Sequence, residues 1–475
     1  MFNYKLSRRA FLAVAGGMTA ASVLAACAPK ATPAPEEQPA KEAEQPAASA
    51  ATATPASAAA PAGETGVTFS YWVGWPNHGD IFEGFMATEE FKTMLGPNKI
   101  EFQDGIKADV LLSNIAAGTP PSVWCGSAYI DIMSRGVARP IADLVETSEL
   151  VNPEDFIPSA WERCSYQGVQ YGVPANECFL EFGLNYNTNL VGEAGLDPDN
   201  PPVTWDELFE WHKALTKFDA NGNLMRIGID PYDAVAGGFS SSIGFMMGAS
   251  WGVKGFDEQT RTFHLDAPEI AEAFETLGEF IKLIGPDNLV GMRSVEGQGT
   301  WGGAYSAGVQ AMIIEGYWHP GETAKDSPDI SKYNRATWLP VPEARRGKLV
   351  QCAGGHMCVL FKEGQNTDVA FMVPEFLQTK PALDVLFNTN GWLPSRPSYL
   401  ETVDPSVYPG LDFYFRSYEE ANDWHIPPRC EIEAFVSTKY QELRENVFRG
   451  TMTGAEAAEA WQKAAEEEWA NAGWA

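Results

Sequence analysis

Segments with strand character alternate with segments with helix character at the start of the folded region, and this order restricts the fold more than any other feature of the sequence. Buried strands are expected where β-branched, aromatic and apolar residues concentrate, at 67–75, 99–102 and 123–125. A helix is expected in each interval, and the second, over 106–117, has Gly118 as its C-terminal stop. This βαβαβ order predicts a mostly parallel sheet covered by helices.

Three later helices are marked by the residues at their start. Thr204 and Glu207 have the spacing of a capping box, in which each side chain accepts a hydrogen bond from the backbone of the other residue. Pro268 fits the first position of a helix whose apolar residues recur every three or four positions. Thr453 is expected to cap a last amphipathic helix that runs to about Trp469.

The chain begins with a segment that is typical of an export signal. Arg8 and Arg9 precede an Ala-rich apolar stretch that is short and weakly hydrophobic for a membrane span. Leu24-Ala25-Ala26-Cys27 resembles the lipobox of bacterial lipoproteins, which implies that a signal peptide of residues 1–26 is removed and that Cys27 is acylated. The two arginines fit a twin-arginine signal and also a general secretory signal, so the export route stays open.

Residues 27–65 are almost entirely Ala, Pro, Thr, Ser, Glu and Gln, without an aromatic residue. Such a segment buries too little apolar surface to offset the entropy of ordering, so a disordered tether is expected. The rest of the chain, from residue 66 to residue 475, exceeds what one hydrophobic core usually covers. Two lobes are therefore expected.

The chain is acidic, with a formal net charge of −30 at pH 7. A surface of this sign repels phosphate backbones, which excludes nucleic-acid binding. Besides Cys27 there are six cysteines, an even number that permits disulfides in an exported protein, but their spacing does not select a pairing. Buried free thiols fit the sequence equally well, and both interpretations stay open.

Cys352, His356 and Cys358 have the even spacing that would place three metal ligands on one face of a strand. Gly354 and Gly355 interrupt that regularity, and no fourth ligand is in view. We therefore expect no metal and no cofactor.

Five stretches occur in an order that carries a family resemblance. They are Ile115–Val123, Tyr171–Pro174 with Leu184–Asn187, Pro201–Leu208, Ser306–Met312, and Gly354-Gly355 leading through a helix to Gly391-Trp392-Leu393-Pro394. Together they resemble the sugar-type (family 1) extracellular solute-binding proteins of bacterial ABC importers. The sequence departs from that pattern at Ser122, where the family usually has Asp, and at Pro374, which is expected to kink a helix over 367–379.

The resemblance implies an α/β, two-lobe periplasmic-binding-protein-like fold with hinge crossovers and an interlobe cleft. It assigns 66–174 plus 318–378 to lobe 1 and 175–317 plus 379–475 to lobe 2. The implied crossings lie near Pro174–Asn176, Glu315–Trp318 and Leu377–Pro381. Gly316, just before two aromatic residues, would then act as a hinge at the cleft floor.

A sugar ring presents a face of C–H groups that stacks on aromatic rings and a rim of hydroxyls that needs polar partners. In open α/β sheets ligands bind beyond the carboxyl ends of the strands. The candidate ligand-binding residues, taken from strand ends and crossovers, are Trp75, Asn77, Trp124, Ser127, Asn176, Glu177, Tyr317, Trp318 and His356. Trp318→Ala is expected to weaken binding without unfolding the protein.

The resemblance implies a monomeric, exported lipoprotein, held at the outer face of the cytoplasmic membrane, that captures a mono- or oligosaccharide and delivers it to an ABC transporter permease. No catalytic residue is expected. The alternatives are a surface glycoside hydrolase and a binder of a polyol or sugar phosphate with the same fold. The predicted cleft segments lack the Arg or Lys cluster that a phosphate needs. A receptor that serves a sensor instead of a transporter also stays open.

Overall fold

The computed structural model describes residues 66–76, 78–233, 245–289 and 303–474. The chain divides into two compact units, 1–62 and 63–475, and only the second contains described residues. The predicted signal peptide, Cys27, the predicted tether and the ligand candidate Asn77 lie outside the described residues. Within the described ranges, every helix is too short or too polar to cross a bilayer.

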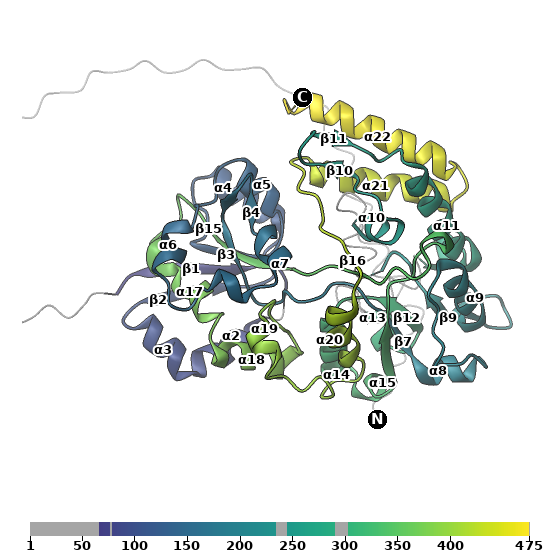
Figure 1. Cartoon of the computed structure of the whole chain (residues 1–475), viewed down its shortest axis with the longest axis horizontal. Coiled ribbons are helices and arrows are strands. Elements are labelled where there is room, and N and C mark those ends of the chain that lie inside the picture. Colours follow the sequence, from purple (N-terminus) through teal and green to yellow (C-terminus); the bar gives the residue numbers. More distant parts are fainter. Residues whose placement is uncertain (1–65, 77, 234–244, 290–302, 475) are drawn as a thin grey trace, which may run out of the picture. The chain divides into compact units, whose positions relative to one another are not determined.

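The first sheet confirms the predicted βαβαβ order (Figure 1). Its strands are arranged as β2 (Lys99–Gln103), β1 (Thr68–Val73), β3 (Val123–Cys125), β15 (Met357–Leu360) and β6 (Gly172–Pro174). As expected, β1 is parallel to β2 and β3, whereas β15 is antiparallel to β3 and β6. The intervals hold α2 (Gly79–Ala87), α3 (Glu89–Leu95) and α4 (Ala108–Ala116).

The second sheet is arranged as β13 (Asn334–Thr337), β7 (Leu184–Asn187), β12 (Gln310–Ile314), β9 (Leu224–Ile229) and β8 (Lys217–Phe218). β12 is parallel to β9 and antiparallel to β7, and β13 is antiparallel to β7. All five residues of β12 are buried, as in a strand covered on both faces. The second lobe also contains α8 (Thr188–Glu193), α9 (Trp205–Leu215), α10 (Phe245–Trp251) and the hairpin β10 (Phe256–Asp257) to β11 (Thr262–Phe263).

Local sequence signals set the ends of several helices as predicted. Thr204 and Thr453 form complete capping boxes at the start of α9 and of α22 (Gly454–Asn471). Pro268 begins α11 (Pro268–Ile284), which packs with α21 (Glu433–Phe448) and α22. The helix expected over 367–379 is split into α16 (Thr367–Ala370) and α17 (Met372–Phe376). The break falls there because Pro374 has no N–H to donate to the carbonyl of Ala370.

Strand pairing corrects two of the predicted crossings between lobes. The first crossing lies between β6 of the first sheet and β7 of the second. The return at Glu315–Trp318 is wrong, because β13 comes later in the chain and still pairs with β7 of the second sheet. The chain returns between β14 (Val350–Gln351) and β15. The crossing at Leu377–Pro381 is also wrong, since α18 (Lys380–Asn390) packs against α2 of the first lobe.

The remaining elements complete the two lobes. Those attached to the first lobe are α5 (Tyr129–Ser134), α6 (Ala142–Thr147), the 3-10 turn η1 (Pro153–Asp155), α7 (Pro158–Arg163), β4 (Ser165–Tyr166), β5 (Val169–Gln170) and α19 (Pro397–Leu400). The elements that belong to the chain segments of the second lobe are α13 (Gly303–Ser306), α14 (Trp318–Asp326), α15 (Pro328–Ser331), the 3-10 turn η3 (Glu343–Arg345), α20 (Leu411–Glu420) and β16 (Asp423–Trp424). α20 packs against β13, so the last crossing lies between α19 and α20.

The two central crossovers pair with each other through backbone hydrogen bonds. The backbone N–H of Gly354 donates to the carbonyl of Phe179 (3.0 Å), and that of His356 donates to the carbonyl of Glu177 (2.9 Å). Gly354 and Gly355 have φ values of 141° and 131°, which favour glycine. Gly316, which was predicted as a hinge, is covered by the ring of Trp318.

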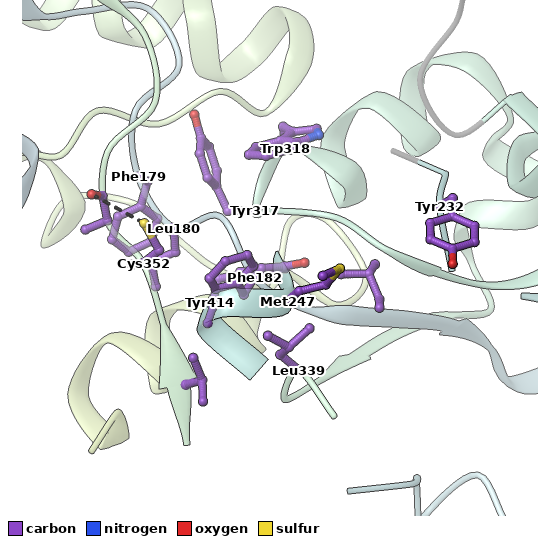
Figure 2. Close-up of a cluster of buried hydrophobic side chains, with 14 of the residues drawn as sticks. Phe179, Leu180, Phe182, Tyr232, Met247, Tyr317, Trp318, Leu339, Cys352 and Tyr414 are labelled. Carbon is purple, nitrogen blue, oxygen red and sulfur yellow. Dashed lines mark hydrogen bonds between the residues drawn. The ribbon is translucent and has the colours of Figure 1, made fainter. Parts of the chain in front are cut away.

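Buried side chains from the crossovers join the core of the second lobe (Figure 2). Phe179 packs edge-on against Tyr317, at a ring-centroid distance of 5.6 Å. The hydroxyl of Tyr414 donates to the carbonyl of Glu315 (2.8 Å) and accepts a hydrogen bond from the side-chain amide of Asn185 (2.9 Å). The first crossover is thus packed, at Phe179, into the core of the second lobe.

The six cysteines of the described ranges are all buried free thiols. They are Cys125, Cys164, Cys178, Cys352, Cys358 and Cys430. The sequence left disulfides and buried free thiols open as interpretations, and the structure shows buried free thiols.

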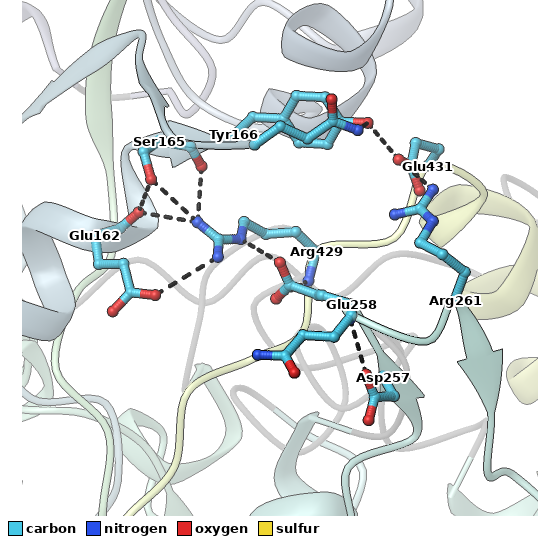
Figure 3. Close-up of polar contacts among 10 residues, drawn as sticks. Glu162, Ser165, Tyr166, Asp257, Glu258, Arg261, Arg429 and Glu431 are labelled. Carbon is cyan, nitrogen blue, oxygen red and sulfur yellow. Dashed lines mark hydrogen bonds and ion pairs between the residues drawn. The ribbon is translucent and has the colours of Figure 1, made fainter.

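The segment between β16 and α21 contacts both lobes and forms an interlobe latch (Figure 3). The Arg429 guanidinium donates to the backbone carbonyl of Ser165 (2.9 Å) in the first lobe and pairs with Glu258 (2.8 Å) in the second. Two residues later, the Glu431 carboxylate accepts hydrogen bonds from Tyr166 and from Arg261. Because the partners come from different lobes, these contacts stabilise the arrangement in which the lobes approach each other.

Arg429→Ala is expected to weaken this latch by about 2 kcal/mol, the usual contribution of hydrogen bonds to a charged group. Hydrogen exchange should then accelerate in the amides of the two hairpins, β4 with β5 and β10 with β11, because the latch contacts β4 in the first and the turn of the second. Lys439→Ala, which removes an ion pair with Glu442 within α21, is the control and should leave those amides unchanged. Equal exchange in both variants would show that the latch contributes nothing.

Candidate ligand-binding site

Four rings from three segments of the first lobe form a ring cluster, defined here as Trp75, His78, His356 and Trp392. The Trp75 ring lies 4.2 Å from the His356 ring and 6.0 Å, edge-on, from the Trp392 ring. His78 stacks on Trp392 at 5.7 Å. Trp75 follows the carboxyl end of β1, His356 precedes β15 and Trp392 follows α18. The cluster therefore lies at the sheet edge where α/β proteins bind ligands.

Two carboxyl groups adjoin the ring cluster. The indole N–H of Trp392 donates to the Glu322 carboxylate of α14 (2.8 Å), which joins the first lobe to a helix that lies between β12 and β13 of the second sheet in the chain. Glu177 lies on the first crossover, beside His356. α14 approaches α18 so closely that a Cβ on Gly321 would lie only 2.4 Å from the carbonyl oxygen of Asn390.

The environment of these carboxyls disfavours their ionised form. Burial and the neighbouring Glu315 carboxylate raise the pKa of Glu322 to about 8. Burial and the Glu322 carboxylate raise the pKa of Glu177 well above its ordinary range. Burial and Glu177 likewise raise the pKa of the Tyr317 hydroxyl. The hydroxyl of Tyr317 donates to the carbonyl of Leu393 (2.9 Å).

The two histidines of the ring cluster are neutral near pH 7. Burial, with a contribution from His356, lowers the pKa of His78 to about 3, and burial lowers the pKa of His356 to about 4. Nδ1 of His356 lies 2.9 Å from the carbonyl oxygen of Gly126, so this nitrogen carries the proton and donates. Nε2 of His356 is then an acceptor.

Four of the nine predicted ligand residues come together at this place: Trp75, Glu177, Tyr317 and His356. Asn77 lies outside the described residues, next to His78. The indole of Trp124 is fully buried in the first lobe and donates to the carbonyl of Ser127 (2.9 Å). The amide of Asn176 donates inward to the hydroxyl of Tyr71 (3.1 Å). Trp318 is 6% exposed. Ligand contact of all nine residues stays a prediction.

Sequence reasoning missed three residues of this arrangement: His78, Glu322 and Trp392. Trp392 was noted as part of a family motif but not as a site residue. Glu322 was overlooked because 315–318 was interpreted as a crossover, whereas Trp318 begins a helix whose second turn carries Glu322. His78 is adjacent to Asn77, and an aromatic residue beside a predicted site residue was a usable signal. Among the described residues, no group of three or more His, Cys, Asp or Glu is arranged to hold a metal ion.

A comparison with known protein families found one family that matches most of the chain. The profile of a family described as bacterial extracellular solute-binding protein matches residues 87–412. A comparison with curated proteins found no matching relative.

Solved structures with a similar fold include several bound to carbohydrates. A mannotriose-bound protein, CpMnBP1, has a TM-score of 0.72 and 18% identity, with 84% of this chain and 100% of that chain covered. A solute-binding protein from Thermotoga lettingae bound to α-D-tagatose has a TM-score of 0.67 and 20% identity, with coverage of 84% and 99%. The maltotriose-bound MalE domain from Bdellovibrio bacteriovorus has a TM-score of 0.65 and 17% identity, with coverage of 84% and 99%. These similarities establish the two-lobe α/β fold.

Proposed function

Because this chain belongs to the bacterial extracellular solute-binding proteins, we propose that it captures a carbohydrate between its two lobes and delivers it to the permease of an ABC importer. The observation that carries the proposal is the ring cluster beside Glu177 and Glu322. Indole faces suit the C–H face of a sugar ring, and carboxyl and imidazole groups suit its hydroxyls. The carbohydrate ligands of proteins with the same fold support this class of cargo.

The proposed mechanism is binding without a covalent step. Trp75 and Trp392 belong to the first lobe, whereas Glu322 lies between β12 and β13 of the second sheet in the chain, so a ligand that touches all three bridges the lobes. Such a ligand stabilises the closed arrangement in proportion to its difference in affinity for the closed and open forms. The paired crossovers at Gly354 and Gly355 would serve as the axis of opening.

The extracellular family implies that the chain is exported. We further propose that a lipid on Cys27 anchors a monomeric protein to the outer face of the cytoplasmic membrane, since Leu24-Ala25-Ala26-Cys27 has the lipobox pattern. Mass spectrometry of the mature N-terminus tests the anchor. An unmodified N-terminus upstream or downstream of Cys27 would contradict it.

The alternatives differ from the proposal in measurable ways. A sugar phosphate is disfavoured because carboxyls, and not free cations, face the ring cluster. A glycoside hydrolase would release product from an oligosaccharide, whereas a binding protein would return the same sugar after long incubation.

A thermal-shift screen of the purified protein against sugars, sugar oligomers, polyols and sugar phosphates tests the proposal. A ligand that binds only the native state raises the melting temperature by mass action, with about 2.7 kcal/mol of stabilisation at a hundred times Kd. We expect a shift with one class of carbohydrate and no turnover. A flat response across all carbohydrates, or release of product, would contradict the proposed function.

A further inference from the structure

We propose that the preferred cargo is an amino sugar, or an oligomer of amino sugars, whose ammonium group lies between the carboxyl groups of Glu177 and Glu322. This inference rests on the proposed function and specifies the chemistry of its ligand. It follows from the charges around the ring cluster, from the polar atoms that are buried there without a partner, and from the aromatic surface beside them.

The basic side chains near these carboxyls have other partners. Arg163 pairs with Glu181 at 2.6 Å. The ammonium of Lys325 donates to the side chain of Asn390 (2.8 Å) and lies 3.9 Å from Asp80. The buried His319 is hydrogen-bonded to Glu315. Within the described part of the chain, neither Glu177 nor Glu322 has a cation at ion-pair distance.

Apart from Lys325, the other titratable groups around the two carboxyls add negative charge or none. Those that act on Glu177 are Glu322, Glu181, Glu315, Cys125, Cys178 and Tyr317. Those that act on Glu322 are Glu315, Asp326, Lys325 and Tyr317. Lys325 is the single cation among them, and it is the one already bound to Asn390.

Buried polar atoms without hydrogen-bond partners lie beside the same place. Oε1 of Glu315, a residue that is 1% exposed and acts electrostatically on both carboxyls, has no partner among the described residues. In the same described part of the chain, both ring nitrogens of the fully buried His78 also lack a partner, as does the indole nitrogen of Trp75. Unpaired acceptors and donors of this kind are costly unless a ligand completes their hydrogen bonds. An ammonium group offers three donors and a sugar rim offers hydroxyls, which together match this set.

A neutral sugar fits this environment less well than an amino sugar. Hydroxyls would satisfy hydrogen bonds, but with a neutral sugar the carboxyls stay protonated, because ionising both in a medium of low dielectric constant would make them repel each other. An ammonium converts that repulsion into two attractive interactions. The half-buried indole of Trp75 adds a cation–π contribution that a neutral group cannot receive.

The pH dependence follows from the same geometry. In the free protein the Glu322 carboxyl holds its proton below about pH 8, so binding of an ammonium must release protons at pH 6. As the pH rises toward the pKa of Glu322, fewer protons have to leave and the affinity for an ammonium ligand increases. This increase in affinity is expected only below the pKa of the ligand's amino group, because the amino group is charged only there. A neutral sugar should show neither the proton release nor this increase.

The test is calorimetry of the full-length protein with three matched sugars: glucosamine, N-acetylglucosamine and glucose, each also as its β-1,4 dimer. We expect the amino form to bind at least about tenfold tighter than the N-acetyl form, a ratio typical of one desolvated charge pair. Titration at pH 6 in two buffers of different ionisation enthalpy should report proton release for the amino form alone. Glu322→Gln should bring the amino to N-acetyl ratio close to one, and Asp329→Asn, at an exposed residue of α15, should leave the ratio unchanged.

Two outcomes overturn the inference and are distinguishable. If neutral or N-acetylated sugars bind as tightly as amino sugars, without proton release, the ammonium site is wrong while the proposed function stands. If none of the sugars binds, and the wider carbohydrate panel also gives no shift, the proposed function fails together with the inference.

Discussion

Replacing Trp75 with alanine will lower the affinity of the protein for its carbohydrate by roughly thirtyfold, corresponding to about 2 kcal/mol, as expected when an aromatic anchor is truncated. The indole is half-buried, lies 4.2 Å from the His356 ring and contacts Trp392 edge-on. Its removal takes away the surface on which a sugar ring can stack. Calorimetry with the sugar identified by thermal shift measures the loss.

The melting temperature without ligand separates this loss from unfolding. Trp75 is not a member of the fully buried core, so Trp75→Ala should lower it by only a few degrees. Trp474→Ala provides the matched control, because Trp474 is 38% exposed near the C-terminus and contacts Trp469 of α22. If both variants bind the sugar equally well, the ring cluster is not the ligand site.

The parts of the fold that the sequence predicted are those that depend on local chemistry. The capping boxes at Thr204 and Thr453 formed because the side chains that satisfy the first N–H groups of a helix lie within four residues of one another. The split at Pro374 follows from one missing N–H. The βαβαβ order of the first sheet was readable because the chain supplies its strands and helices in sequence.

The crossings between lobes could not be predicted in the same way, because they depend on pairing between distant segments. β13 lies beside β7, from which it is separated by more than a hundred residues, and no local signal in 334–337 selects that edge. Gly316 looked like a hinge because glycine tolerates unusual φ values. Here it is small for another reason, since a Cβ would lie 2.1 Å from the ring of Trp318.

The same distinction between local signals and contacts of distant segments explains which residues of the candidate site were predicted. Trp75, Glu177 and His356 were predicted because strand ends and crossovers carry ligand residues in α/β proteins. Glu322 joined them only through the close approach of Gly321 to the end of α18, which places α14 against Trp392. Contacts of this kind are tertiary, and a single sequence does not contain the register between two helices.

Gly355→Ala is expected to destabilise the protein by about 3 kcal/mol or more, since it combines backbone strain with a steric clash. Gly355 has a φ of 131°, a region that L-residues rarely adopt. A Cβ there would lie 2.5 Å from the carbonyl oxygen of Glu177, and that oxygen accepts the hydrogen bond from the N–H of His356. The variant must therefore separate the two crossovers or give up the bond that joins them.

Gly347→Ala is the control that separates strain from clash. Gly347 also has a positive φ, 91°, but a Cβ at this position would meet no atom within 4 Å. Chemical denaturation should show a loss of about 1 kcal/mol for Gly347→Ala, at the low end of the cost of a strained backbone, and a clearly larger loss for Gly355→Ala. Equal losses would mean that the crossovers move apart at no cost, and the paired backbone could then not be the axis of opening. A larger loss at Gly355, together with weaker sugar binding, would tie the position of Glu177 in the site to the geometry of the hinge.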